Sequence, residues 1–260
     1  MPLRIYLIGR SHLDFDALNR FLLDHNASWK RSNDVAQGEE IVEIAGRLCY
    51  MSFGKRQKHT NKDFIHHLLR KGHESVLEHV NWTFLVCGVS RAFTHQLVRH
   101  RVGFSFSQLS QQYYDQTEAE FIKPPILAKF PKACAAWEQA IHITKKSYRE
   151  ILGELATLDI PSQNGISKKE ARRLIRSSAR SVLPNATETK IVMTANARAI
   201  RNFLCARGSI PGDEEMRMVC AELLKLLKDE APAIFMDFEI ETLGDGSPIV
   251  IHREVKEKTK

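Results

Sequence analysis

The stretch that decides the fold and the chemistry of this chain opens with a basic triplet and continues with hydroxyl and amide side chains. It runs Arg99-His100-Arg101-Val102-Gly103-Phe104-Ser105-Phe106-Ser107-Gln108-Leu109-Ser110-Gln111-Gln112-Tyr113. Neighbouring side chains lie about 100° apart on a helix, so the triplet cannot share one helical face and would surround whatever it binds. The polar residues after it predict a loop suited to a pyrimidine ring, a ribose and a phosphate, which need many directed hydrogen bonds. A solvated basic turn beside a polar loop is the alternative that these residues alone leave open.

The residues before the triplet predict how the fold presents it. Residues 82–87 are aromatic and branched and predict a strand. Ser90 is placed to cap a helix that runs through Phe93 and Leu97 and ends at the triplet.

The remainder of the chain alternates between strand and helix patterns. Residues 4–8 and 189–194 read as strands, while Ser167 and Glu170 have the spacing of a capping box that starts a helix. Helical patterns also cover 196–207, which Gly208 ends, and 213–228. We therefore predict an α+β fold with a mixed sheet and packed long helices. A single domain over residues 1–260 is expected, with a helical segment at about 124–160 inserted between the motif blocks.

Composition restricts the class of protein and its ligands. The 260 residues are 43% apolar and 27% charged, which is typical of a globular chain. No segment resembles a signal peptide or a membrane span, so we expect a cytoplasmic protein. The net charge of +7 favours anionic ligands. The five cysteines include no Cys-x-x-Cys pair and predict reduced, mostly buried thiols, with Cys205 in a helix core.

The opening stretch resembles the signature of the flavin-dependent thymidylate synthases. That signature is Arg-His-Arg, two residues, and then Ser-x-Asn/Ser-x-x-Ser-x-Arg-Tyr; here Arg99-His100-Arg101 is followed by Ser105, Ser107, Ser110 and Tyr113. The resemblance extends to the histidine segment at 73–79, to the blocks at 183–188 and 196–207, and to 215–217 and 231–235. It thus covers most of the chain outside about 124–160.

The resemblance implies a site that holds FAD and a pyrimidine nucleotide. The residues that would contact FAD are Ser75, Arg99, His100, Arg101, Gln108, Asn196, Arg198 and Asn202. Those that would contact the nucleotide are Gln96, Leu97, Val98, Arg99, Gln108, Leu109, Ser110, Gln111, Gln112, Arg180 and Arg207. Arg207 matches the arginine that polarises the pyrimidine and favours ionisation at its N3, so it is the catalytic candidate.

The implied reaction is the FAD-dependent reductive methylation of dUMP to dTMP. Methylenetetrahydrofolate would donate the carbon and NADPH would reduce the flavin, so no cysteine nucleophile is required. The family works as a homotetramer whose active sites use several chains, and the same is expected here.

Two departures from the signature bear on the substrate. Val102-Gly103-Phe104 places three residues where the signature has two, and Gly103 could absorb the extra residue in a tight turn. Gln112 stands where the signature has an arginine that helps to bind the nucleotide phosphate. Losing one charge-assisted contact removes about 1.5–3 kcal/mol, so a paralogue that methylates UMP or dCMP is the alternative.

Two other classes of protein compete with this interpretation. A metal hydrolase is suggested by a group of possible ligands in a short span, namely His73, Glu78, His79, His95 and His100. They lack the i, i+4 histidine pair of a zinc helix, so no metal is expected. A basic helix face at 168–176 fits a nucleic-acid-binding module, although a solvated surface or a tetramer contact explains it equally simply. We expect no nucleic-acid partner and no membrane partner.

Overall fold

The computed structural model describes residues 2–31, 34–54, 60–158 and 165–253. Their contacts divide the chain into two compact units. Unit 1 consists of residues 1–4, 86–99 and 107–191, and unit 2 consists of 5–85, 100–106 and 192–260. The single domain over 1–260 stays a prediction.

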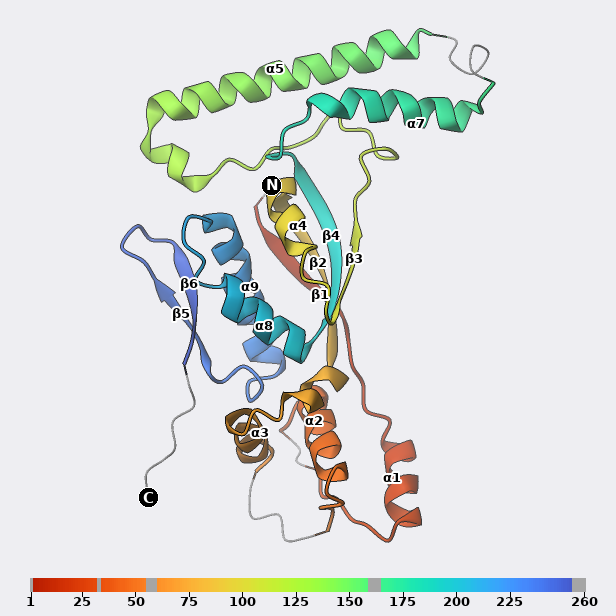
Figure 1. Ribbon diagram of the computed structural model, residues 1–260, viewed down its shortest axis with the longest axis vertical. Helices are drawn as coiled ribbons and strands as arrows, with labels where there is room; N and C mark the ends of the chain where they lie inside the picture. The colour runs from red at the N-terminus through yellow and green to blue at the C-terminus, as the bar shows by residue number, and fades with distance from the viewer. Residues whose placement is uncertain (1, 32–33, 55–59, 159–164, 254–260) are drawn as a thin grey trace. The chain divides into compact units, whose positions relative to one another are not determined.

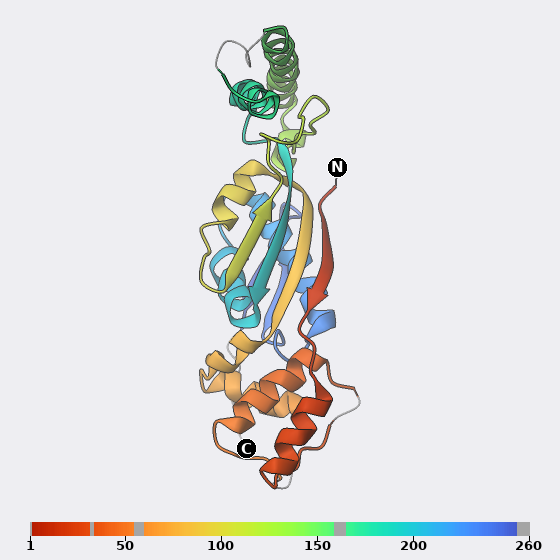
Figure 2. The ribbon, with the colours of Figure 1, turned by 90° about the vertical axis from the view of Figure 1, so that its right-hand side faces the viewer.

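The main sheet has four strands in the order β1-β2-β4-β3 (Figure 2). Their bounds are β1 Arg4–Arg10, β2 Asn81–Ser90, β3 Phe104–Gln108 and β4 Glu188–Asn196. Two backbone hydrogen bonds show that β2 and β4 are antiparallel. Arg91 N, after the end of β2, donates to Thr187 O, before the start of β4, and Ala197 N, after the end of β4, donates to Val80 O, before the start of β2. Leu109 N to Lys190 O and Asn196 N to Gly103 O relate β3 and β4 in the same way.

Unit 1 contains a short helix and a pair of longer ones. Helix α4, Arg91–Leu97, starts at the Ser90 cap, whose hydroxyl accepts from Phe93 N, and it buries Phe93 and Leu97. Helices α5, Pro131–Ala156, and α7, Lys168–Ala179, lie side by side (Figure 1). Tyr148 of α5 is fully buried, and its hydroxyl accepts from Gln116 N at 3.1 Å, which ties α5 to the turn after β3.

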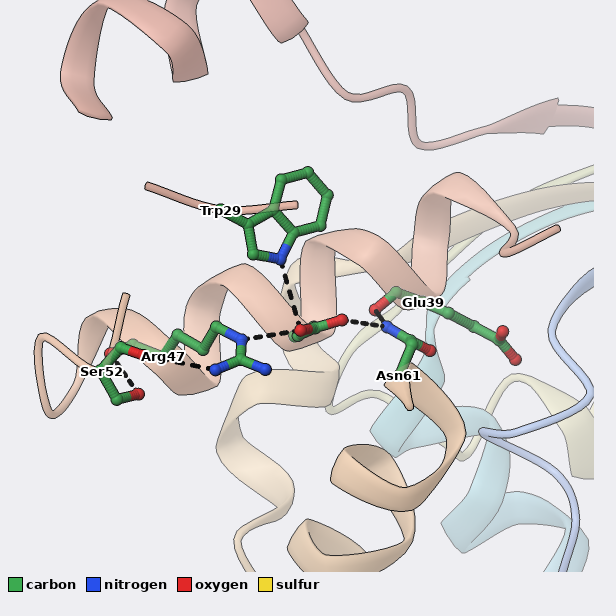
Figure 3. A network of polar contacts seen from close by, with 6 residues as sticks. Trp29, Glu39, Arg47, Ser52 and Asn61 are labelled. Atoms are coloured by element: carbon green, nitrogen blue, oxygen red, sulfur yellow. Dashed lines mark hydrogen bonds and ion pairs between the residues drawn. The ribbon is translucent and has the colours of Figure 1, made fainter. Parts of the chain in front are cut away.

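The N-terminal helices of unit 2 are joined by a buried polar network. These helices are α1, Phe15–Asp24, α2, Gln37–Leu48, and α3, Asn61–Arg70, followed by the short helix η1, Glu74–His79. Glu43 of α2 accepts from Asn61 Nδ2 at 2.7 Å, Arg47 Nε at 2.7 Å and Trp29 Nε1 at 3.3 Å (Figure 3). Because a buried carboxylate needs donors on both oxygens, this network fixes α3 and the Trp29 segment onto α2.

The C-terminal part of unit 2 forms the core around two helices and a hairpin. Helices α8, Ala197–Arg207, and α9, Glu214–Glu230, both contact β6 of the antiparallel hairpin β5–β6, Phe238–Thr242 and Pro248–His252. Phe203, Leu204, Met216, Leu224 and Phe238 are fully buried. Apolar burial on this scale is the main source of stability for unit 2.

The structure confirms the α+β class and most of the predicted elements, and it corrects three expectations. The four-stranded sheet is antiparallel throughout rather than mixed. Residues 104–108, predicted as part of a loop, form β3, because the alternation of Phe104 and Phe106 with serines is a strand period. Only Cys87 and Cys220 are buried, and Cys205, expected in a helix core, is exposed on α8. Among the described residues, no helix is long and apolar enough to cross a membrane.

Candidate functional site

In unit 1, the fold fixes Gln108 from two sides at the end of β3. Its Nε2 donates to Thr94 Oγ1 of α4 at 3.0 Å and to Thr189 Oγ1 of β4 at 3.3 Å. Both threonines are buried, with exposed fractions of 0% and 1%. Because the amide nitrogen is used for these bonds, the side-chain carbonyl of Gln108 is the group left for a ligand.

The turn after β3 carries the next predicted nucleotide residues. Ser110 Oγ accepts from Gln112 N at 3.3 Å and so shapes the turn. Gln111 is buried, and its Nε2 has no hydrogen-bond partner within the described part of the chain. A buried amide donor without an acceptor destabilises the fold, so a ligand or a second chain that accepts a hydrogen bond from it would be favoured.

Three predicted nucleotide residues are apolar and differ in exposure. The side chain of Leu97 is 1% exposed and belongs to the core of unit 1. Val98 and Leu109 are half-buried, and Leu109 is held through its backbone N–H to Lys190 O. Their side chains offer no polar atoms, so a nucleotide could gain only apolar or main-chain contacts from them.

A pair of arginines without acidic partners lies in the same unit. Arg91 begins α4, and Arg180 follows α7 as its C-cap. Burial and the charge of Arg180 lower the pKa of the Arg91 guanidinium. Across the described ranges, neither guanidinium pairs with a carboxylate. Two neighbouring cations that lack an acid favour binding of an anion such as a phosphate.

Gln112 is held by helix α7. Its Oε1 accepts from Arg173 Nε at 3.1 Å, and its Nε2 lies 3.4 Å from Ser177 Oγ, to which it donates. Arg176 Nη1 donates to the backbone oxygen of Tyr113 at 2.6 Å. The loop residue that departs from the signature is thus in direct contact with an arginine from another element.

In unit 2, His100 and Arg207 form a hydrogen-bonded pair. Arg207 is the last residue of α8, and its Nε donates to His100 Nε2 at 3.1 Å. Burial and the charge of Arg207 lower the pKa of His100, so the imidazole is held neutral and accepts this bond. The His100 ring also meets Phe203 edge-on at 5.1 Å between centroids. The two terminal nitrogens of Arg207 remain to donate to a ligand.

Acid should weaken the hydrogen bond by which His100 orients Arg207. Because the pKa of His100 lies below its ordinary value of 6.5, protonation below that pH removes the acceptor and repels Arg207. We expect catalytic efficiency with a pyrimidine nucleotide to fall on the acid side with an apparent pKa below 6.5. The His100→Gln variant, whose carbonyl accepts without titrating, should lose this part of the pH profile. A profile that is the same for both proteins contradicts the role given to His100.

Gly103 absorbs the extra residue of the signature. Its φ is +72°, the left-handed region that glycine adopts freely, and its carbonyl accepts from Asn196 N at 3.1 Å. A Cβ at this position would lie 2.7 Å from Ala199 Cβ and 2.7 Å from Asn196 Nδ2. The tight turn predicted from the sequence is therefore confirmed, and it is pressed against the first turn of α8.

The Gly103→Ala variant separates steric conflict from backbone strain. We expect it to lower the free energy of unfolding by about 2–4 kcal/mol, combining left-handed strain with overpacking against Ala199. Gly72→Ala is the matched control, because Gly72 also has a positive φ, +68°, but nothing lies within 4 Å of its Cβ position. It should cost only about 1–2 kcal/mol. If urea denaturation shows that both variants lose the same free energy of unfolding, the contact of Gly103 with α8 is not important for stability.

Two of the other predicted FAD residues, Asn196 and Arg198, lie at the start of α8. Asn196 caps α8 by accepting from Ala199 N at 2.8 Å, so its capping role is structural as well. Arg198 pairs with Glu78 at 2.6 Å and with Glu74 at 3.6 Å, and both acids belong to η1, the short helix that also carries Ser75. Arg101, Ser75 and Asn202 are exposed. Arg99 is exposed and belongs to unit 1.

Sequence reasoning missed several residues around the predicted nucleotide site. Thr94 and Thr189 orient Gln108, and Arg91 forms the cationic pair with Arg180. Arg173 was assigned only to a basic helix face. The available signal was the spacing of 173, 176 and 180, which repeats every three to four residues and puts these arginines on one side of α7. No cluster of three potential metal ligands occurs among the described residues.

Comparisons with known proteins agree with the motifs. The family model described as "Thymidylate synthase complementing protein" matches residues 33–233. A protein of Mycobacteroides abscessus named "Flavin-dependent thymidylate synthase" is 39% identical over 253 residues, 96% of each chain. A protein of the same name from Mycobacterium avium is 40% identical over 250 residues, which cover 95% of this chain and 94% of that protein.

Proposed function

This chain belongs to the family of thymidylate synthase complementing proteins, and from this premise we propose that it is a flavin-dependent thymidylate synthase that converts dUMP to dTMP. The observation that carries the proposal is the similarity to a protein of that name, with 39% sequence identity over 96% of both chains. Each unit also carries predicted site residues with directed donors or cations, which suit a nucleotide or a phosphorylated cofactor.

The residues of unit 2 suit a flavin nucleotide such as FAD. Arg101, Arg198 and Asn202 offer guanidinium and amide donors at the surface, and Ser75 adds a hydroxyl. Arg198 would exchange its exposed ion pairs with Glu74 and Glu78 for a phosphate, at little cost since exposed pairs contribute little. When bound, the reduced flavin supplies the hydride that the reaction needs.

The residues of this chain then bind and polarise the pyrimidine. In unit 2, Arg207, oriented by His100, would stabilise negative charge on a pyrimidine ring. In unit 1, the Arg91 and Arg180 guanidiniums would bind a nucleotide phosphate. A thiol nucleophile is disfavoured for Cys220, because burial raises the pKa of its thiol far above its ordinary value. These roles agree with a mechanism that uses a flavin rather than a cysteine.

Methylenetetrahydrofolate is the proposed carbon donor and NADPH the proposed reductant. A homotetramer in the cytoplasm, with active sites built from several chains, is part of the same proposal. A second chain would also provide a partner for the buried Gln111 amide.

The choice of nucleotide can be tested directly because Gln112 and Gly103 depart from the signature. NADPH oxidation by the flavin-loaded protein should depend on dUMP, with UMP and dCMP compared side by side at equal concentration and with methylenetetrahydrofolate present. We expect turnover with dUMP to exceed that with the other two nucleotides. Turnover of UMP or dCMP with dUMP left unchanged would overturn the choice of dUMP and favour a paralogue with another substrate.

A further inference from the structure

Gln112 is the one signature position at which this chain replaces an arginine by a neutral residue. Both ends of its amide are used by α7, the carbonyl by Arg173 at 3.1 Å and the nitrogen by Ser177 at 3.4 Å. An amide whose two ends are already bonded within the protein is poorly placed to bind a ligand. The contact therefore gives Gln112 another task, which is to hold the side chain of Arg173.

The hydrogen bond to Gln112 leaves the charged fork of Arg173 available. Among the described residues, the guanidinium makes this one hydrogen bond, through Nε, and lies 5.6 Å from the centre of the Tyr113 ring. Its charge also lowers the pKa of Glu170, but that carboxylate is bonded mainly to Ser167 in the capping box of α7. The two terminal nitrogens of Arg173 remain as a planar pair of donors, the arrangement that phosphate prefers.

Arg173 lies on the same side of α7 as Arg180, one of the two cations already described. Residues 173, 176, 177 and 180 repeat at three- to four-residue spacing and lie on one side of the helix. Arg173 and Arg180 are separated by roughly 10 Å along the axis, at about 1.5 Å per residue, which two extended arginine side chains can bridge. Arg176 fixes the loop from the same side by its bond to Tyr113 O at 2.6 Å.

We propose that Arg173, anchored by Gln112, supplies the guanidinium contact to the nucleotide's 5′-phosphate that the signature places on residue 112. The positive charge is carried by Arg173 of α7 instead of by loop residue 112, and Gln112 in the loop positions the Arg173 side chain. This assignment rests on the proposed function, since it takes a pyrimidine nucleotide as the ligand. It gives the chain a phosphate-binding residue outside the signature and makes residues 112 and 173 an interdependent pair.

The test compares binding of dUMP and of deoxyuridine, which lacks the phosphate, by calorimetry on the flavin-loaded protein. Arg173→Ala should weaken dUMP about ten- to a hundredfold, the effect of losing one charge-assisted contact, and leave deoxyuridine unchanged. Arg173→Gln, which keeps a donor for Gln112 but not the charge, should show the same loss. Arg172→Ala is the matched control, because Arg172 is exposed and its Nε bonds only to Lys168 O within α7; it should change neither affinity.

The double variant Gln112→Arg with Arg173→Ala returns the charge to the loop and should recover dUMP affinity. Unchanged dUMP binding in Arg173→Ala, an equal loss for dUMP and deoxyuridine, or a double variant as weak as Arg173→Ala would overturn the assignment. These results are distinct from a failure of the proposed function. In that case the unaltered protein would bind neither flavin nor dUMP, whereas failure of the Arg173 assignment leaves both intact.

Discussion

Arg207→Ala should lower kcat for dTMP formation by about 10²–10³-fold, the usual effect of removing a preorganised donor from a developing anion. The guanidinium ends α8 and is held through Nε by the neutral acceptor His100, so its remaining donors are oriented before a substrate arrives. A donor that needs no rearrangement during the reaction contributes mainly to kcat. Steady-state kinetics with saturating dUMP measures this loss.

Arg207→Lys provides the control for charge. It keeps a cation but loses the planar fork and the Nε that His100 accepts, so we expect a loss between those of the alanine variant and the unaltered protein. Flavin content and melting temperature should be the same in all three proteins. If Arg207→Ala keeps kcat within threefold, the catalytic role of Arg207 is wrong.

Arg201→Ala should lower the free energy of unfolding by about 3–5 kcal/mol, because it leaves a buried carboxylate without its counter-charge. Arg201 and Asp237 are 5% and 7% exposed, and both carboxylate oxygens lie 2.6 Å from the guanidinium. Arg201 also donates to Ile234 O at 2.6 Å, so its loss releases the segment before β5. Urea denaturation monitored by tryptophan fluorescence gives the change.

Arg253→Ala is the matched control for an exposed pair. Arg253 bonds Glu239 and Glu241 on the surface of the β5–β6 hairpin, and its loss should change the free energy of unfolding far less than the loss of Arg201. The Arg201→Met and Asp237→Leu double variant should recover much of the stability lost by Arg201→Ala, since no buried charge is left unpaired. Equal effects of Arg201→Ala and Arg253→Ala would contradict the importance of burial.

The same pair predicts how stability depends on pH. Burial alone would raise the pKa of Asp237, but the hydrogen bonds and charge of Arg201, aided by His252, hold it below its ordinary value of 3.8. A carboxyl with a lowered pKa stabilises the fold above its unfolded pKa, and this stabilisation is lost as the pH falls through the folded value. The free energy of unfolding should therefore fall as the pH drops below about 4, and this fall should be smaller in the double variant, which lacks Asp237.

Local signals in the sequence predicted most of the elements. Ser90 caps α4 and the Ser167–Glu170 pair forms a capping box, because both effects act within one helical turn. Strand β3 was missed, since its serines and glutamine looked like ligand-binding groups while Phe104 and Phe106 kept the alternation of a strand. The all-antiparallel order depends on pairings between distant segments, which no local pattern encodes.

The candidate site was predictable only where a residue acts within its own motif. The resemblance pointed to Arg207, His100 and Gln108, but not to the contacts that orient them. His100 lies 107 residues from Arg207, and Thr189, which the resemblance did not include, lies 81 residues from Gln108. Arg173 read as part of a solvated basic face, since its contact with Gln112 spans 61 residues. The candidate role of Arg173 becomes visible only when the folded chain brings the loop with Gln112 against α7.

We infer that this chain transfers a one-carbon unit to dUMP with a bound flavin. The most direct measurement incubates the purified, flavin-loaded protein with dUMP, NADPH and methylenetetrahydrofolate that carries ¹³C in its methylene group, followed by mass spectrometry of the nucleotide. We predict dTMP with the label in its methyl group, formed only when flavin and NADPH are both present. If the protein contains its flavin and dUMP is recovered unchanged and unlabelled, the chain does not methylate dUMP and the proposed function is wrong.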